Sequence, residues 1–385
     1  MTATSSSRIS WLLDHEYSAA IGLAAGVTIA LTWSAIFSAS YFTIFTSHSG
    51  SHLFTELGVS SVHDVVVNGL MAIFFFAMGL ELSRELSSGL LTRPGHAIPP
   101  VLGAAGGMLF TALGSILLGT LLHSGALRRG WGVPMATDVA FTLGVLAIAG
   151  RRLAPSIRIF LLTLAITDDV LSVVVLSVSG TTHVRLDGLA VLVATVLVGA
   201  IVAQRVTSSV ACVGLLVALW ICFAWANVEP ALAGVLAGVL VSSHAPSRLR
   251  LERNATRLSV GLVLPLFALA ACGLHWSSVQ LSGAVGTVVV ATVGIRLVGK
   301  TLGITSGVAL ARGLRFRLAP SITWPLIFTT ALLCAIGFTV PLLFATKLFG
   351  AQSPLYAGYT LGLLLSSLVA ALLGGALLRL QHPTE

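Results

Sequence analysis

The sequence predicts an all-α polytopic membrane protein with about twelve transmembrane helices. Charged residues make up only 9% of the chain, and hydrophobic residues make up 56%. The mean hydropathy is +1.00. At roughly 20 apolar residues for each span plus short connections, 385 residues accommodate about a dozen helices.

Twelve apolar segments can be drawn along the chain, and no connection is long enough for a soluble module. They run near 18–39, 64–84, 97–122, 133–150, 156–178, 186–204, 208–226, 229–243, 258–274, 283–311, 326–349 and 354–379. We therefore expect residues 1–385 to form a single membrane domain, with 1–17 as an N-terminal segment and 380–385 as a tail.

The arginines and lysines predict the orientation of these spans. An even number of spans places both termini on one side, together with the connections 85–96, 151–157, 205–207, 244–257 and 312–325. That side carries fifteen of the 21 Lys and Arg residues and the other side four, while Arg296 and Lys300 fall inside a span. By the positive-inside rule both termini are cytoplasmic. The net charge of +8 is scattered through short loops, which argues against nucleic-acid binding.

The cysteines and histidines predict no metal centre. The cysteines are Cys212, Cys222, Cys272 and Cys334, all in apolar segments. Neither they nor the ten histidines show the spacing of metal ligands, so the sequence implies no cofactor. The cysteines are interpreted as small core residues.

Two of the twelve segments are poor continuous helices. The interrupting residues are Pro134, Thr137 and Asp138 in 133–150, and Gly337, Thr339 and Pro341 in 326–349. Each segment is the second of three in a candidate inverted repeat, formed by spans 3–5 and 10–12. Paired interruptions of this kind indicate discontinuous helices around a transport site near the bilayer midplane. A pair of proline-kinked helices is the alternative.

Asp168 and Asp169 stand in the middle of the apolar stretch 159–178. One carboxylate at the centre of a spanning helix costs roughly 2.5–3.5 kcal/mol on insertion scales. Two adjacent carboxylates also repel each other, which favours keeping a proton on one of them. Such a pair predicts a site that binds a cation and protons in alternation.

Three further charges lie inside the predicted spans. Lys300 is too far inside 283–311 to reach water by snorkelling, so it is the expected ion-pair partner of one aspartate. A buried lysine also gives up its proton readily, which makes it a candidate for proton exchange. Arg296, one turn away, is interpreted as a structural counter-ion or a cytoplasm-facing group. Asp138 would neutralise two helix N-termini at the interruption, and Lys300 the two C-termini.

A second group of charges lies at the cytoplasmic end of the second span. Glu81, Arg84 and Glu85 share one helix face. Glu252 belongs to the arginine-rich loop 244–257 on the same side of the membrane. The group is interpreted either as a titratable cluster at a funnel mouth or as a solvated helix end.

Six motifs occur in an order that is typical of one transporter family. They are NGLMAIFFFAMGLELSREL (68–86), GWGVPMATDVAFTLGVLAIAG (130–150), LLTLAITDDV (161–170), LPLFA (264–268), VGKTLGI (298–304) and IGFT (336–339). With these motifs the chain resembles the NhaA-type sodium/proton antiporters, from the second span to the end of the twelfth. The resemblance implies twelve helices in inverted repeats, with spans 4 and 11 unwound where they cross.

The resemblance also implies roles for the charged residues. Asp169 would be the principal ligand of Na⁺ or Li⁺, with Asp168 close to Lys300. Thr137 and Asp138 would belong to the unwound part of span 4. The corresponding residues of span 11 are Gly337 and Thr339, and the pH-responsive cytoplasmic region would contain Glu81, Arg84, Glu85 and Glu252.

Family members exchange external protons for internal sodium or lithium, and the lysine-bearing type is electrogenic. The expected partners are therefore Na⁺, Li⁺, H⁺ and the lipid bilayer, with a homodimer through the outer loop 40–63 and no nucleic acid. The expected location is the bacterial cytoplasmic membrane.

Several positions depart from the family pattern, among them Val340 and Pro341 after IGFT. Because of four of them, the pH dependence of family members is not carried over to this chain. Asn68 stands where members have aspartate, and Asp64, one turn earlier, is a candidate substitute. Glu229, Arg253 and Thr256 stand at or beside positions where members have histidine.

Other functions would also use buried carboxylates. A sodium-coupled solute symporter of the same architecture would move an organic substrate together with sodium. An intramembrane aspartyl protease needs two carboxylates that face each other, which adjacent residues on one helix do poorly. A passive channel is disfavoured because paired carboxylates would trap a cation. We therefore interpret the single domain 1–385 as a secondary antiporter and not an enzyme.

Overall fold

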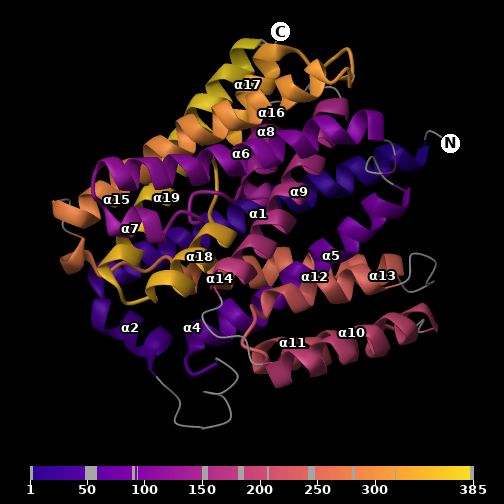
Figure 1. The fold of residues 1–385 in the computed structure, drawn as a ribbon, viewed down its shortest axis with the longest axis horizontal. Helices are drawn as coiled ribbons and strands as arrows, with labels where there is room; N and C mark the ends of the chain where they lie inside the picture. The colour runs from indigo at the N-terminus through magenta and orange to yellow at the C-terminus, as the bar shows by residue number, and fades with distance from the viewer. Residues whose placement is uncertain are drawn as a thin grey trace. The chain divides into compact units, whose positions relative to one another are not determined.

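The computed structural model describes residues 3–47, 59–88, 92, 94–149, 155–180, 186–205, 208–241, 248–279, 282–316 and 318–381 (Figure 1). Every regular element in these ranges is a helix, and they contain no strand. The all-α class predicted from hydropathy is thus confirmed. The chain folds into two compact units, each built from stretches that are distant in the sequence.

Unit 1 comprises Met1–Ile21, Arg93–Ser172 and Leu274–Glu385. Its helices are α6 (Pro94–Leu121), α7 (Gly125–Arg129), α8 (Val139–Ala149), most of α9 (Pro155–Gly180), η4 (Trp276–Ser278), α15 (Gly283–Gly294), η5 (Ile295–Lys300), α16 (Thr301–Gly313), α17 (Trp324–Leu333), α18 (Thr339–Phe349) and α19 (Pro354–Gln381). The two larger stretches contain the predicted spans 3, 4 and 10–12 and most of span 5, so most of both candidate repeats lies in one unit.

Unit 2 comprises Gly22–Thr92 and Val173–Gly273. It holds the end of α1 (Ala3–Ile36), then α2 (Ser38–Thr46), α4 (Val62–Asp64), η1 (Val65–Leu70), α5 (Met71–Ser88), α10 (Leu186–Arg205), α11 (Ser209–Trp225), α12 (Ala231–Leu240), α13 (Arg248–Leu258), η3 (Ser259–Val263) and α14 (Leu264–Ala271). The outer loop 40–63, named for a dimer contact, begins within α2, and its residues 48–58 lie outside the described residues.

The helix ends agree with the expected spans to within a few residues in most places. Among the described residues, seven helices are long and apolar enough to cross a membrane, and further apolar helices are shorter. The count of twelve spans stays a prediction.

The expected loop 244–257 is wrong over most of its length, because Arg248–Leu258 forms α13. This helix is amphipathic: Leu251 and Ala255 are buried, while Arg250 and Arg253 are exposed. The high charge of the segment conceals an apolar face that repeats every four residues.

Facing glycines bring helices close together in both units. In unit 1, a Cβ on Gly303 of α16 would lie 2.4 Å from the carbonyl oxygen of Gly106 in α6. In unit 2, a Cβ on Gly234 of α12 would lie 2.2 Å from the oxygen of Ala72 in α5. Small residues let membrane helices approach closely and gain van der Waals contact with each other.

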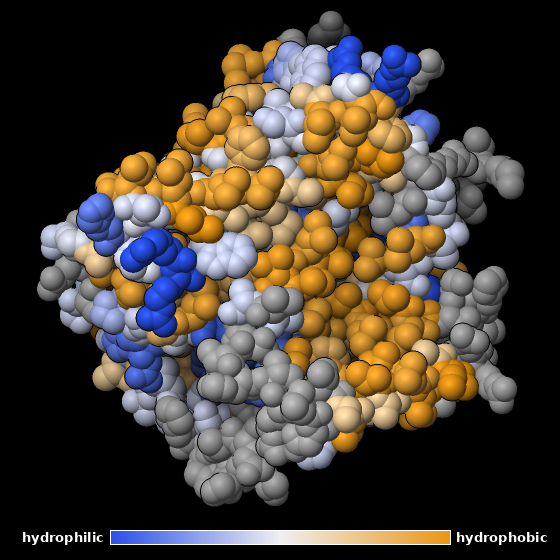
Figure 2. All heavy atoms as spheres, viewed as in Figure 1, coloured by the Kyte–Doolittle hydropathy of each residue, from blue (hydrophilic) through white to orange (hydrophobic). Residues whose placement is uncertain are grey.

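Apolar side chains cover much of the face of the molecule shown in Figure 2. Large exposed hydrophobic residues occur on many helices, including Leu117, Val210, Val290 and Leu372. Soluble monomers rarely expose large contiguous apolar patches. The surface therefore fits a multi-pass membrane protein surrounded by hydrocarbon.

Candidate functional site

The candidate ion site lies in unit 1, where two non-helical segments each join a pair of helices. One segment, 130–138, connects α7 to α8, and the other, 334–338, connects α17 to α18. The segments touch, because the N–H of Asp138 donates to the Ile336 carbonyl at 2.8 Å. Each interrupted helix leaves backbone N–H and C=O groups that need partners.

Asp168 of α9 is fully buried and forms an ion pair with Lys300. The Lys300 Nζ lies 2.7 Å from Oδ1 and 2.8 Å from Oδ2, and both side chains are 0% exposed. The backbone N–H of Thr137 donates to the same Oδ2 at 2.7 Å. A carboxylate in such a place needs these partners, because an isolated buried charge is very costly. Three residues nominated from the sequence therefore meet at one carboxylate.

Lys300 is the last residue of the π-helical turn η5. Its Nζ also donates to the Met135 carbonyl in the first non-helical segment. Gly107 of α6 leaves room for the lysine stem, since a Cβ there would lie 3.3 Å from Lys300 Cδ. Short π-helical turns occur frequently at functional sites.

Asp169 follows Asp168 in α9 and is 2% exposed. Consecutive residues of an α-helix point about 100° apart, so the two carboxylates leave α9 in different directions. The site thus has two buried acids on one helix, of which Asp168 is the partner of Lys300.

Asp138 accepts hydrogen bonds from the N-termini of two helices. The N–H of Phe141 in α8 donates to Oδ1 at 3.2 Å, and the N–H of Thr339 in α18 donates to Oδ2 at 3.4 Å. The side chain is buried. One carboxylate therefore offsets the partial positive charges of both helix N-termini. This geometry is the one expected for the compensating role of Asp138.

The carbonyl groups of the two segments are bound mainly by Arg296, a role that the sequence analysis gave to Lys300. The guanidinium donates to the carbonyls of Pro134 at 3.0 Å, Ala136 at 2.9 Å and Ala335 at 3.0 Å. Arg296 is 0% exposed, so the cytoplasm-facing interpretation is wrong. The sequence indicates this role through the spacing of Arg296 and Lys300, which are four residues apart and therefore share one helix face.

Threonine hydroxyls and a glycine complete the junction. Thr137 Oγ1 donates to the Cys334 carbonyl at 2.9 Å. Gly337 donates its N–H to Ser367 Oγ of α19 at 3.2 Å. Gly337 also has no space for a side chain, because a Cβ would lie 1.9 Å from Arg296 Nη2. Thr339 begins α18.

The second group of charges also meets, in unit 2. Arg84 of α5 donates through Nη1 to Glu252 of α13, and its Nη2 lies 3.3 Å from Glu81 Oε1. Arg248 of α13 donates to a backbone carbonyl of α5 at 2.7 Å. Glu85 follows Glu81 by one turn on α5. The cluster therefore joins α5 to α13 through charged side chains.

Asp64, the candidate substitute for the aspartate missing at Asn68, forms a helix cap. Its Oδ2 accepts from Ser60 Oγ at 2.8 Å and from the Ser61 N–H at 3.1 Å. Ser61 Oγ in turn accepts from the Asp64 N–H at 3.1 Å, which completes a capping box. The cap accounts for Asp64 without a transport role.

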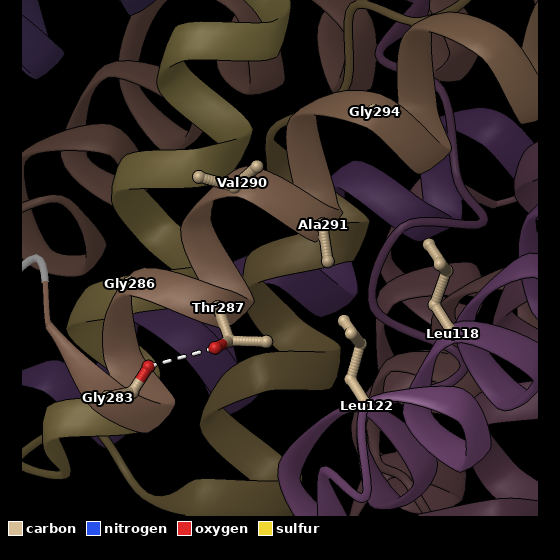
Figure 3. A pocket seen from close by; sticks show the side chains of 8 residues that line it. All are labelled: Leu118, Leu122, Gly283, Gly286, Thr287, Val290, Ala291 and Gly294. Atoms are coloured by element: carbon tan, nitrogen blue, oxygen red, sulfur yellow. Dashed lines mark hydrogen bonds between the residues drawn. The ribbon is translucent and has the colours of Figure 1, made fainter.

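Unit 1 also has a surface groove, whose lining is uncharged, unlike that of the ion site (Figure 3). It has a volume of about 590 Å³ and is lined by Leu118, Leu122, Gly283, Gly286, Thr287, Val290, Ala291 and Gly294. No lining residue is charged, and the Thr287 hydroxyl donates to the Gly283 carbonyl at 2.9 Å. The groove therefore offers no carboxylate for a cation.

The chain is similar to known sodium/proton antiporters in sequence and in fold. A family model described as Na⁺/H⁺ antiporter 1 matches residues 10–378. The chain is 38% identical over 332 residues to the Na⁺/H⁺ antiporter NhaA of Yersinia enterocolitica, covering 83% of this chain and 82% of that protein. NhaA of Yersinia pseudotuberculosis is 37% identical with the same coverage. The solved structure of the sodium proton antiporter MjNhaP1 from Methanocaldococcus jannaschii has a TM-score of 0.59 and 16% identity, covering 94% of this chain and 91% of that one, which shows a shared fold.

Proposed function

The chain belongs to the Na⁺/H⁺ antiporter 1 family, with relatives named NhaA, and we propose that it exports Na⁺ or Li⁺ in exchange for H⁺ across a bacterial cytoplasmic membrane. One observation carries the proposal. Two buried acids, Asp168 and Asp169, are consecutive in α9, and Asp168 pairs with the buried Lys300. Its carboxylate also meets one of two non-helical segments that touch each other. Carboxylate oxygens suit a hard cation such as Na⁺, and they also bind protons.

Exchange follows from competition between the ion and protons for these carboxylates. With the site open to the cytoplasm, deprotonated Asp169 binds Na⁺, assisted by Asp168, the Thr137 oxygen and backbone carbonyls. Binding of Na⁺ beside Asp168 weakens the attraction that holds the Lys300 ammonium, which favours release of its proton. After the ion leaves outside, protons return to the same groups and are delivered inward.

Alternating access requires the site to open to each side in turn. We assign the moving part to the interrupted helices and their neighbours, α8, α9, α17, α18 and α19. The cluster of Glu81, Arg84, Glu85 and Glu252 on the cytoplasmic side is assigned to the control of exchange by pH.

Everted membrane vesicles test the exchange directly. A pH-sensitive dye reports lumenal acidification, and added Na⁺ or Li⁺ should dissipate it, whereas K⁺ should not. Asp168→Asn and Asp169→Asn should each abolish the response because both acids hold the exchanged ions. Asp187→Asn, which changes an acid of α10 in unit 2, serves as the control. Wild-type flux from the Asp169→Asn protein would contradict the assignment of Asp169 as an ion ligand.

A further inference from the structure

The Arg296 guanidinium connects both non-helical segments of the ion site. Its Nη1 and Nη2 bind the carbonyls of Pro134 and Ala136 in 130–138, and its Nε binds the carbonyl of Ala335 in 334–338. The side chain is fully buried. A planar guanidinium holds its donors in a fixed fork, so these three hydrogen bonds also fix the relative positions of the carbonyls.

One of these hydrogen bonds is a single peptide group away from the ion-binding carboxylate. The Ala136 carbonyl accepts from Arg296 at 2.9 Å, and the N–H of the same peptide, on Thr137, donates to Asp168 Oδ2 at 2.7 Å. Because the peptide group is planar, fixing its C=O also fixes the direction of its N–H. Hydrogen bonds in such a chain polarise one another.

Arg296 and Lys300 share three consecutive carbonyls but differ in their chemistry. Arg296 binds those of Pro134 and Ala136, and Lys300 binds that of Met135 between them. A guanidinium stays charged at all relevant pH values, whereas a buried lysine can lose its proton. When Lys300 is neutral, the carbonyl ends of the two non-helical segments therefore still have one positive charge beside them, that of Arg296.

We propose that Arg296 is a positioning residue of the ion site, which orients the Ala136–Thr137 peptide toward Asp168 and keeps the carbonyl ends neutralised while Lys300 exchanges its proton. This proposal rests on the proposed exchange function. It gives Lys300 freedom to titrate, because the interrupted helices do not depend on its charge alone.

Replacement of Arg296 by methionine tests the proposal in three ways. In purified protein, hydrogen–deuterium exchange of the amides in 134–141 should become roughly tenfold faster or more, since the carbonyls that hold this segment in place lose their guanidinium donor. The apparent KM for Na⁺ should rise severalfold. The pH profile of exchange should move roughly one unit toward alkaline pH, because the loss of one positive charge favours the protonated forms nearby.

The titratable groups around the guanidinium are few in the described part of the chain. They are Asp168 and Asp169 on α9, Asp138 before α8, Cys334 after α17 and Lys300 on η5 itself. The sequences of α6 and α15, which pack along η5, bring no carboxylate, lysine or arginine. The alkaline shift therefore reports on these five groups, of which Asp168, Asp169 and Lys300 belong to the proposed exchange.

Two further variants separate charge from geometry. Arg296→Lys keeps the charge without the fork, so its pH profile should stay near wild type while amide exchange still accelerates. Gly337→Ala displaces the guanidinium, because a Cβ would lie 1.9 Å from Nη2, and should act like Arg296→Lys. These variants also serve if Arg296→Met does not fold. Arg128→Met, at an exposed arginine of α7, is the control for loss of charge.

The result that overturns the proposal is wild-type amide exchange in 134–141 together with a wild-type KM and pH profile in Arg296→Met. Failure of the exchange function itself has a different signature. The unmodified protein would then show no Na⁺-dependent flux, while amide exchange would still respond to the Arg296 variants.

Discussion

The ion pair between Asp168 and Lys300 lies where neither side chain touches solvent. A buried pair of this kind adds little net stability over well-packed apolar residues, because desolvation offsets most of the attraction. Removal of one partner is different, since it strands a charge and costs roughly 3–5 kcal/mol. The ion pair therefore adds little to stability, but the stability of the folded protein depends strongly on both partners being present. This suits a site whose charges must change during each cycle.

Lys300→Met should lower the thermal stability of the folded protein. Without Lys300, the buried Asp168 carboxylate loses its ion-pair partner, and stranding one charge of a buried pair costs roughly 3–5 kcal/mol. Thermal unfolding in detergent measures this loss.

The control for this prediction is Lys347→Met, at an exposed lysine of α18. It should change stability by only about 0.5 kcal/mol or less, as surface substitutions usually do. Equal melting temperatures of Lys300→Met and wild type would contradict the prediction.

The sequence identified most of the charged residues of the site, but not all of their partners. Asp168, Lys300 and Asp138 could be nominated because charge in an apolar stretch is costly and needs compensation. The same argument predicted that one of the two aspartates pairs with Lys300, and the family resemblance implied that it is Asp168. The sequence left Arg296 open between a structural counter-ion and a cytoplasm-facing group. Its partners are backbone carbonyls, which every residue has, so only the path of the non-helical segments identifies them.

At the scale of helices, contacts between glycines set the distance between α6 and α16. Gly106 and Gly303 have no space for a Cβ, since each would come within 2.4 Å of the other's carbonyl oxygen. Gly303 follows Lys300 by three residues on the same continuous helix. The close approach therefore also sets how far the lysine reaches toward Asp168. The sequence did not predict α13, because the segment is rich in charged residues. Its apolar side chains form a common face only when the segment is coiled into a helix.

Gly303→Ala should push α6 and α16 apart. The added methyl group would meet backbone atoms, which cannot rotate away, so we expect a loss of about 1–3 kcal/mol. Gly294→Ala in α15 is the matched control, since a Cβ there meets nothing within 4 Å. The control should be neutral or stabilising by up to about 1 kcal/mol, because alanine favours the helix. Thermal unfolding compares the two, and equal melting temperatures would contradict the packing argument.

At the scale of the whole molecule, the number of proton-binding groups determines how the membrane potential acts. If Asp169 and Lys300 each carry one exchanged proton, as in the proposed exchange, a cycle returns two protons for one Na⁺ and moves one net charge. Each charge contributes about 2.3 kcal/mol for every 100 mV of potential. That energy sustains roughly a 50-fold sodium gradient even with equal pH on both sides.

Proteoliposomes with the same pH inside and outside test this charge movement. Inward diffusion of K⁺ through valinomycin makes the lumen positive, which drives two protons out and one Na⁺ in, whichever way the protein is inserted. We expect Na⁺ to accumulate in the lumen only when valinomycin is present, and Asp169→Asn liposomes to accumulate none. One-for-one exchange moves no net charge, so sodium uptake that is indifferent to valinomycin would show that Lys300 and Asp169 do not each carry a proton.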